Sequence, residues 1–396
     1  MSYRSIPIIP NFIDLKNKAI QFFMHWLSFS ASAKNKETTC FYGISHFSFH
    51  NHIRHLSPGY FSLVMASGIV SLAAHIYGFN MVAHGLLYFN IVAYLWLLAL
   101  FIARLFLYWN LCKADFYNLN ISPGHLAFVA GSAVLGVQFV RFWDHYYLAV
   151  LMYVLSSVAW LFLIYAFFTV ITVAHEKPKF SKSISGSWLL IIVSTQSIAV
   201  LGIQVAHHFN IYVEPILFCS LILFLCGCMF YIFIITLIVY RMSFFDLLAK
   251  EFAPSYWINM GATAISVLAG SHLITNADKW FFLQDILPFL KGFTLLYWAI
   301  GTWWIPFVVI MGIWRTVLKQ FPLKYHPLYW SMVFPLGMYT VCTYKMAQAL
   351  QLSFLKELSE VFVYIALGSW IITFVGMVVY YLRHPFFKDD SLPLQD

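Results

Sequence analysis

Long runs of apolar residues alternate with short polar breaks along most of this chain. A helix needs roughly 20 apolar residues to cross a bilayer core, and ten runs reach about that length. Polar residues or prolines separate almost every neighbouring pair of runs. The pattern predicts an all-α polytopic membrane protein with ten transmembrane helices, at residues 58–78, 83–108, 123–140, 147–174, 186–206, 213–240, 254–275, 286–314, 327–350 and 358–382.

The odd-numbered runs begin alike, which indicates an internal repeat. Four start at a proline and the third at a glycine, and these anchor residues lie 63 to 73 residues apart: Pro58, Pro123, Gly186, Pro254 and Pro327. Proline suits the first helical turn because its missing N–H would have no partner there. We therefore expect five quasi-repeated helical hairpins that run the same way and close around a central pore.

Composition excludes most other classes of protein. The chain is 62% hydrophobic and 10% charged, whereas an ordinary soluble domain is about 25% charged. Soluble enzymes, secreted disulfide scaffolds and disordered proteins are therefore excluded. The net charge of +8 indicates no nucleic-acid partner, because the basic residues flank the apolar runs.

The distribution of Lys and Arg predicts the orientation. Of the 23 such residues, 18 fall on the side that would hold both termini, so both termini should be cytoplasmic in the cell (inner or plasma) membrane. We expect a cytoplasmic arm at residues 1–56, the ten-helix domain at 57–384 and a cytoplasmic tail at 385–396. The arm carries no pattern of a cleavable signal peptide, and its residues 12–29 have the spacing of a membrane-surface helix.

Small or kinking residues recur seven to ten positions past each anchor. Small residues midway through the bilayer leave room for a lumen, although they also allow tight helix packing. Five such clusters at one depth favour a central pore. The predicted pore-lining residues are Gly68, Ala130, Gly131, Ser194, Thr195, Gly261, Ala262 and Gly337.

A second recurring position, 17 or 18 residues past each anchor, carries polar and basic side chains. It contains His75, Arg141, Gln204, His272 and Lys345. Such a ring at the outer mouth would concentrate anions, while the alternative is that these side chains snorkel to the headgroups. The middle of the apolar runs holds no Asp or Glu, which disfavours cation pathways and most proton relays.

Three motifs carry a family resemblance: SPGYF with VMASGIVS at 57–71, GTWWIP at 301–306, and WSMVFPLG at 330–337. They resemble the tellurite-resistance/dicarboxylate transporter family, which includes plant slow-type anion channels and fungal malate and sulfite permeases. The resemblance covers about 55–385 and implies five hairpins, a homotrimer with one pore per subunit, and a phenylalanine of the ninth helix that occludes each pore. The matching gate residues are Phe334 and Pro335, whereas Gly186 departs from the prolines at the other anchors.

We therefore expect an anion channel, or channel-like transporter, for small inorganic or organic anions. The alternative is a proton-coupled C4-dicarboxylate (malate-type) or sulfite/tellurite carrier, in which His75, His207 or His272 would replace the missing carboxylates. A membrane oxidoreductase with haem between histidines is disfavoured because no paired-His pattern recurs on one helix. No enzyme activity and no cofactor are expected, and a metal site is disfavoured for the cluster of His46, His50, His52 and His55.

Overall fold

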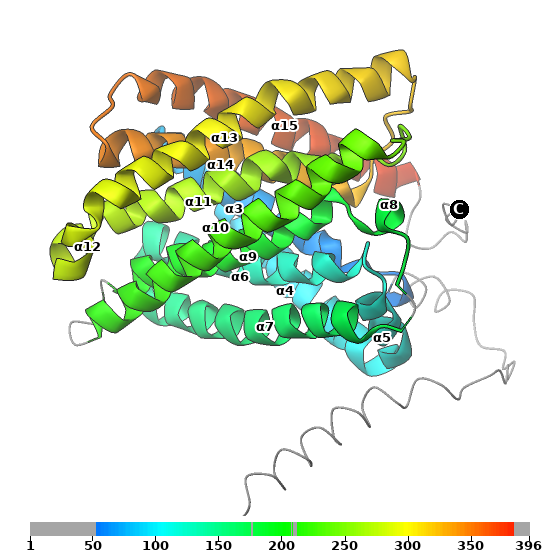
Figure 1. The fold of residues 1–396 in the computed structure, drawn as a ribbon, viewed down its shortest axis with the longest axis horizontal. Coiled ribbons are helices and arrows are strands. Elements are labelled where there is room, and N and C mark those ends of the chain that lie inside the picture. Colours follow the sequence, from blue (N-terminus) through cyan, green and yellow to red (C-terminus); the bar gives the residue numbers. More distant parts are fainter. Residues whose placement is uncertain (1–52, 176, 207, 209–211, 384–396) are drawn as a thin grey trace, which may run out of the picture. The chain divides into compact units, whose positions relative to one another are not determined.

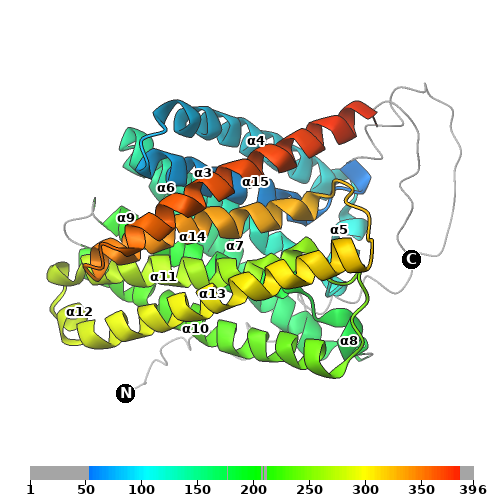
Figure 2. The same cartoon turned by 90° about the horizontal axis from the view of Figure 1, so that it is seen from above.

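The computed structural model describes residues 53–175, 177–206, 208 and 212–383 (Figure 1). The predicted surface helix at 12–29, three of the four clustered histidines and His207 lie outside the described residues. Within them, regular structure is entirely helical (Figures 1 and 2). The ten long helices are α3 (Ser62–Ile76), α4 (Asn80–Leu107), α6 (Leu126–Trp143), α7 (Tyr146–Val173), α9 (Leu190–Ala206), α10 (Val213–Phe244), α11 (Ile258–Thr275), α13 (Leu287–Ile313), α14 (Trp330–Ala349) and α15 (Leu355–Arg383).

Nine helices of the described part are long and apolar enough to cross a membrane. They account for every predicted span except 327–350, which corresponds to α14. That helix has 20 residues, but Thr340, Thr343 and Lys345 lower its apolar content. The fold class is thus confirmed as all-α and polytopic, with α14 a long helix that composition alone does not mark as a span.

The helices form five hairpins whose two members differ in burial. In the four hairpins where both helices count as spans, 78–100% of the first helix is buried but only 22–33% of the second. The fifth hairpin follows suit, because most of α14 is buried and only 17% of α15 is. The inner helices are therefore α3, α6, α9, α11 and α14, and the outer helices are α4, α7, α10, α13 and α15.

The inner helices pack in a closed ring. Each contacts the next in the order α3, α6, α9, α11 and α14, and α14 contacts α3 again. Four outer helices lie over the groove between their own inner helix and the next one: α4 on α3 and α6, α7 on α6 and α9, α10 on α9 and α11, and α15 on α14 and α3. The last hairpin thus completes the ring against the first.

The anchor residues begin short 3₁₀ turns that form a second ring at one end of the bundle. These turns are η1 (Pro58–Phe61), η2 (Ser122–His125), η3 (Gly186–Leu189), η4 (Pro254–Trp257) and η7 (Pro327–Tyr329). Each contacts its two neighbours, and η7 contacts η1. The departure at Gly186 has a steric cause, because a Cβ there would lie 2.5 Å from backbone atoms of Ser255 and Tyr256. Proline has a Cβ, so it does not fit at this anchor.

We predict that Gly186→Ala destabilises the protein. The Cβ would meet backbone that has no flexible end to move away, and overpacking of this kind costs about 1–3 kcal/mol. The melting temperature in detergent should fall. The matched control is Gly292→Ala in α13, where a Cβ meets nothing within 4 Å; its melting temperature should hold or rise. Equal melting temperatures for Gly186→Ala and wild type would contradict the steric explanation.

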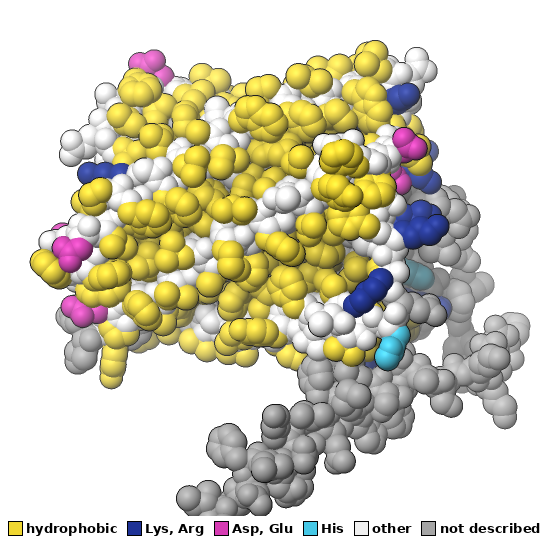
Figure 3. Space-filling model, in the orientation of Figure 1, with side chains coloured by type: hydrophobic (Ala, Val, Ile, Leu, Met, Phe, Trp, Pro, Cys, Tyr) yellow, Lys and Arg dark blue, Asp and Glu magenta, His cyan; other side chains and the backbone are white. Residues whose placement is uncertain are grey.

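Most Lys and Arg side chains gather at the end of the bundle that carries the 3₁₀ turns, α5 (Trp109–Tyr117) and α8 (Phe180–Ser183) (Figure 3). We call it the basic end, and its opposite the far end. Three arginines there tie an outer helix to the carbonyl four or five residues before its own hairpin's anchor. The bonds run from Arg104 to Arg54, from Arg241 to Ser181 and from Arg315 to Ala249.

Candidate functional site

A narrow cavity lies inside the ring of inner helices. Its volume is about 20 Å³, room for about one water molecule. All five inner helices contribute to its wall, with positions 11 and 14 residues after the anchors. The lining residues are Ile69, Leu72, Val134, Val137, Ser197, Val200, Ile265, Leu268 and Met338. The internal repeat therefore determines which face of each inner helix is turned inward.

The wall of this cavity is apolar except for Ser197. The Ser197 hydroxyl donates to the carbonyl of Val193, 2.7 Å away on the same helix, so its hydrogen is already engaged. An ion in this space would lose water contacts and gain few polar contacts from the protein. Narrow apolar constrictions of this kind control passage by excluding water.

A layer of side chains one turn nearer the basic end closes this space. It lies seven residues after the anchors and consists of Met65, Ala130, Val193, Gly261 and Phe334. Positions 7, 11 and 14 of a helix share one face. The four side chains of this layer are fully buried, and none of its residues borders the cavity. Phe334 is the largest of the five.

The ring of Phe334 occupies the place where Gly261 carries no side chain. A Cβ at Gly261 would lie 3.3 Å from two ring carbons of Phe334 and 2.9 Å from Cγ of Pro335. The fold therefore brings together three residues that the sequence had singled out. Pro335 lies inside α14, where it removes the N–H that would bond to the carbonyl of Ser331.

Other predicted pore-lining residues lie at contacts between helices. A Cβ at Gly68 would meet Val134 and Asn90, one at Gly131 would meet Val64, and one at Gly337 would meet Ile69 and Val70. Gly68, Gly131 and Gly337 thus allow neighbouring inner helices to approach closely. Ser194 donates to the carbonyl of Ile191 in its own helix, and Ala262 is fully buried beside Gly261.

Hydroxyl groups nine residues after three of the anchors face the outer helices. Their partners are aromatic side chains on α15, α4 and α7, at 2.8–2.9 Å: Trp370 with Ser67, Tyr94 with Ser132, and Trp160 with Thr195. Thr195, a predicted pore-lining residue, is one of them. These bonds satisfy polar groups that hydrocarbon would otherwise penalise, and they hold the inner and outer layers in register. The sequence signal was the fixed offset of nine from the anchors.

The five predicted outer-mouth residues all lie near the far end. Nε2 of Gln204 and Nε2 of His272 are 3.1 Å apart, and the ring of His75 packs on that of Phe142, with centroids 4.6 Å apart. Nζ of Lys345 donates to Oε1 of Gln348 at 3.3 Å. Arg141 and Lys345 come from α6 and α14, which flank α3, and each lies within the other's electrostatic range.

Hydrogen bonds from both flanking outer helices position α14. From α13, Trp298 Nε1 donates to Thr343 at 3.1 Å, and the hydroxyls of Thr302 and Tyr339 are 2.8 Å apart. From α15, Ser359 donates to the carbonyl of Thr340 at 2.7 Å. Motif residues 301–306, whose role the sequence left open, thus include a support for the helix that carries Phe334.

His326 caps the turn that leads into α14. Its Nδ1 accepts the backbone N–H of Leu328 at 3.2 Å. Burial, with a smaller contribution from the nearby Arg315 guanidinium, lowers the pKa of His326. The neutral imidazole that can accept this bond is therefore favoured.

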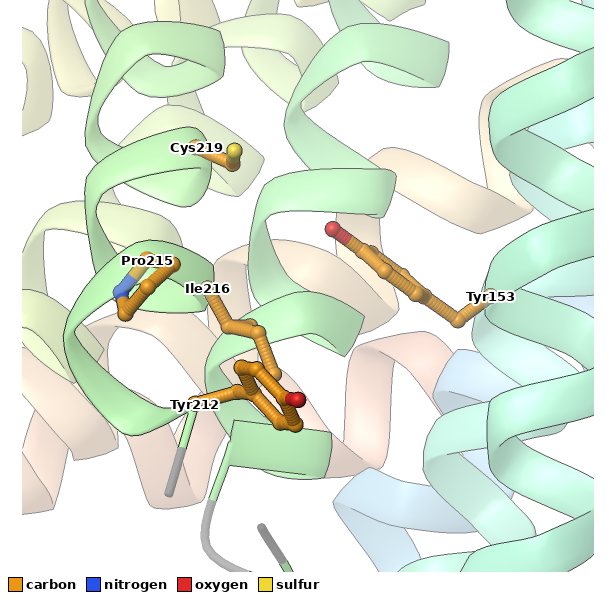
Figure 4. Close-up of a pocket in the computed structure, with 5 residues that line it drawn as sticks. All are labelled: Tyr153, Tyr212, Pro215, Ile216 and Cys219. Carbon is orange, nitrogen blue, oxygen red and sulfur yellow. The ribbon is translucent and has the colours of Figure 1, made fainter. Parts of the chain in front are cut away.

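A second, larger cavity of about 340 Å³ lies away from the ring axis. Figure 4 shows Tyr153 of α7 directed towards α10, which contributes Pro215, Ile216 and Cys219, with Tyr212 just before that helix. None of the predicted site residues lines it. Within the described ranges, no group of three His, Cys, Asp or Glu residues is arranged to hold a metal ion.

Comparison with known proteins gives consistent matches. A sequence model of the SLAC1 family, described as voltage-dependent anion channel, matches residues 55–378. A Mycobacterium tuberculosis protein described as an uncharacterized membrane protein is 38% identical over 148 residues, 37% of this chain and 75% of its own length. Two Methanocaldococcus jannaschii proteins described as uncharacterized transporters are 22% and 21% identical over 82% and 86% of this chain, and 92% and 98% of their own.

Proposed function

This chain belongs to the SLAC1 family of voltage-dependent anion channels, and we propose that it conducts small monovalent anions through one pore in each subunit, with Phe334 as the gate. The family predicted from the sequence motifs is thereby confirmed, and the protein is a multi-pass membrane protein of a channel and transporter family. The anion, the gate and the assembly are proposals.

One observation carries the proposal. The five inner helices form a closed ring within a single chain, and its inward-facing register is apolar, narrow and interrupted by one aromatic side chain. A pathway enclosed by one chain needs no neighbouring subunit to complete it. Phe334 lies in the layer where the cavity ends, which is the position expected of a gate.

The apolar wall favours weakly hydrated anions. An ion that enters must leave much of its water behind, and the cost of desolvation rises with charge density. Large monovalent anions such as nitrate should therefore pass more readily than chloride, and chloride more readily than fluoride. Doubly charged anions should be excluded almost completely.

The test is a set of reversal potentials in planar bilayers. With Phe334→Ala protein and nitrate on one side, chloride, fluoride or sulfate is placed on the other. We expect a permeability order of nitrate, chloride and fluoride, with no measurable sulfate current. A linear empty-bilayer leak is the control, and cation-selective current or equal permeability to all four anions would contradict the proposal.

A coupled carrier remains the second candidate, because one observation favours it. His272 is buried near the far end, 3.1 Å from Gln204, and a buried histidine can take up a proton at physiological pH. Under this alternative, malate, sulfite or tellurite uptake would depend steeply on a proton gradient. Flux in proteoliposomes with and without that gradient separates the two functions.

We also propose an orientation and an assembly. The basic end, where η1 begins and α15 ends, should face the cytoplasm, since positive charge is retained on that side. The family resemblance implies a homotrimer, and the apolar outer helices offer surface for subunit contacts. Protease access to the termini in sealed vesicles and the mass of the intact assembly test these two points.

A further inference from the structure

Two positive side chains approach each other at the far end. Arg141 and Lys345 both lie 18 residues past their anchors, in the register of the inward-facing positions 7, 11 and 14. Their helices, α6 and α14, lie on either side of α3 in the inner ring. Each charge lies within the electrostatic range of the other. The two cations therefore stand over the same mouth.

No carboxylate neutralises this pair within the described residues. The ion pairs found there join Arg104 to Asp115 and Arg241 to Glu251, both at the basic end. Asp144 lies within electrostatic range of Arg141, but the two form no ion pair. Lys345 bonds to the neutral amide of Gln348. Two like charges held together without a counter-ion are an attractive site for an anion with two charges.

From this arrangement, and resting on the proposed function, we infer that the far-end mouth is a binding site for doubly charged oxyanions, which block the pore from that side. The ligand class is sulfate or a C4 dicarboxylate. Its two charged ends or edges would be shared between Arg141 and Lys345, and guanidinium offers two parallel N–H donors to such oxygens.

The cavity below explains why binding would lead to block. A doubly charged anion can be held at the mouth by two cations, but the next layers inward are lined by Leu72, Val137, Val200 and Leu268. Because the Born cost of desolvation grows with the square of the charge, the ion that binds best at the mouth enters the lumen worst. A monovalent anion binds more weakly there and moves on.

The experiment measures nitrate current through Phe334→Ala protein with sulfate added to the far-end side. We expect sulfate to reduce the current, in competition with nitrate. Lys345→Gln and Arg141→Gln, each in the same background, should raise the half-blocking sulfate concentration by about tenfold or more, equivalent to about 1.4 kcal/mol. Lys345→Arg should retain the block. Lys291→Gln, an exposed lysine near the far end of α13, is the matched control and should leave it unchanged.

Several results would overturn the inference. Sulfate current, seen as a shifted reversal potential, would make the mouth a transport site. A block that is absent, or that persists unchanged in both glutamine variants, would show that Arg141 and Lys345 do not form the site. Each variant must still carry nitrate current, which shows that it has folded.

The inference and the proposed function fail in different ways. If Phe334→Ala carries no anion current, the proposed function fails. Sulfate binding is then measured as a rise in the melting temperature of purified protein. That rise should disappear in Lys345→Gln and Arg141→Gln but persist in Lys291→Gln, and a rise of equal size in all three would refute the site.

Discussion

Phe334→Ala should fold, assemble and carry a much larger anion current than wild type. The substitution removes the one bulky ring from the layer of Met65, Ala130, Val193 and Gly261, and so joins the cavity to the space on its basic side. Lowering the barrier by each 1.4 kcal/mol raises flux about tenfold, so an increase of roughly tenfold or more is expected. Macroscopic and single-channel currents in planar bilayers at matched protein density provide the measurement.

Two further variants make this result specific. Phe224→Ala removes an equally buried ring from α10, where it packs beside Phe293; this should cost about 3–5 kcal/mol of stability and open nothing. Ala130→Phe in the Phe334→Ala background returns a ring to the same layer from another inner helix, and should restore the low current. If Phe334→Ala is silent beside a conducting wild type, or if Ala130→Phe leaves the current high, Phe334 is a packing residue.

A negative charge attached at position 197 should nearly abolish that current. Ser197 is the one polar residue of the cavity wall, so a thiol at this site in Ser197→Cys would face the pore. Reaction with a small sulfonate-bearing methanethiosulfonate would place a fixed charge beside the anion path. At a separation of about 4 Å, two like charges repel by about 4 kcal/mol at an effective dielectric constant near 20. The current in the Phe334→Ala background should therefore fall by roughly a hundredfold or more.

Thr195→Cys is the matched control, two residues away on the same helix. Thr195 accepts a bond from Trp160 of α7, so a thiol there faces the outer helix and the reagent should leave the current unchanged. The Phe334→Ala background treated alone corrects for native cysteines. Strong inhibition of Thr195→Cys with none of Ser197→Cys would place the pore on the opposite face of α9.

The hairpin architecture could be predicted because the repeat and the hydropathy are local properties of the sequence. The anchors, the pairing of buried with exposed helices and the family all follow from positions that recur at fixed spacing. The gate layer was also within reach, since Phe334 and Gly261 share the offset of seven from their anchors. An aromatic residue opposite a glycine is a complementarity that sequence alone can suggest.

The lining of the cavity was harder to predict because small size and polarity each have two structural explanations. Gly68 and Gly337 are small because helices touch there, and Ser67 and Thr195 are polar because tryptophans of outer helices donate to them. Choosing between an inward and an outward face requires the phase of each helix about its own axis. The offsets of 11 and 14 carry that phase, but their meaning becomes visible only when five helices are superimposed.

Closure of the ring by its last member has a consequence for biosynthesis. Ser62 bonds to Ser331, 269 positions later, and Ser67 to Trp370, 303 positions later. At about 5–20 residues per second, translation of the intervening chain takes roughly 15–60 seconds, during which α3 has been made but neither of these partners exists. The nascent bundle is then an open arc with hydroxyls on its free edge. A chaperone or insertase that shields that edge until α14 and α15 arrive would raise the yield of closed protein.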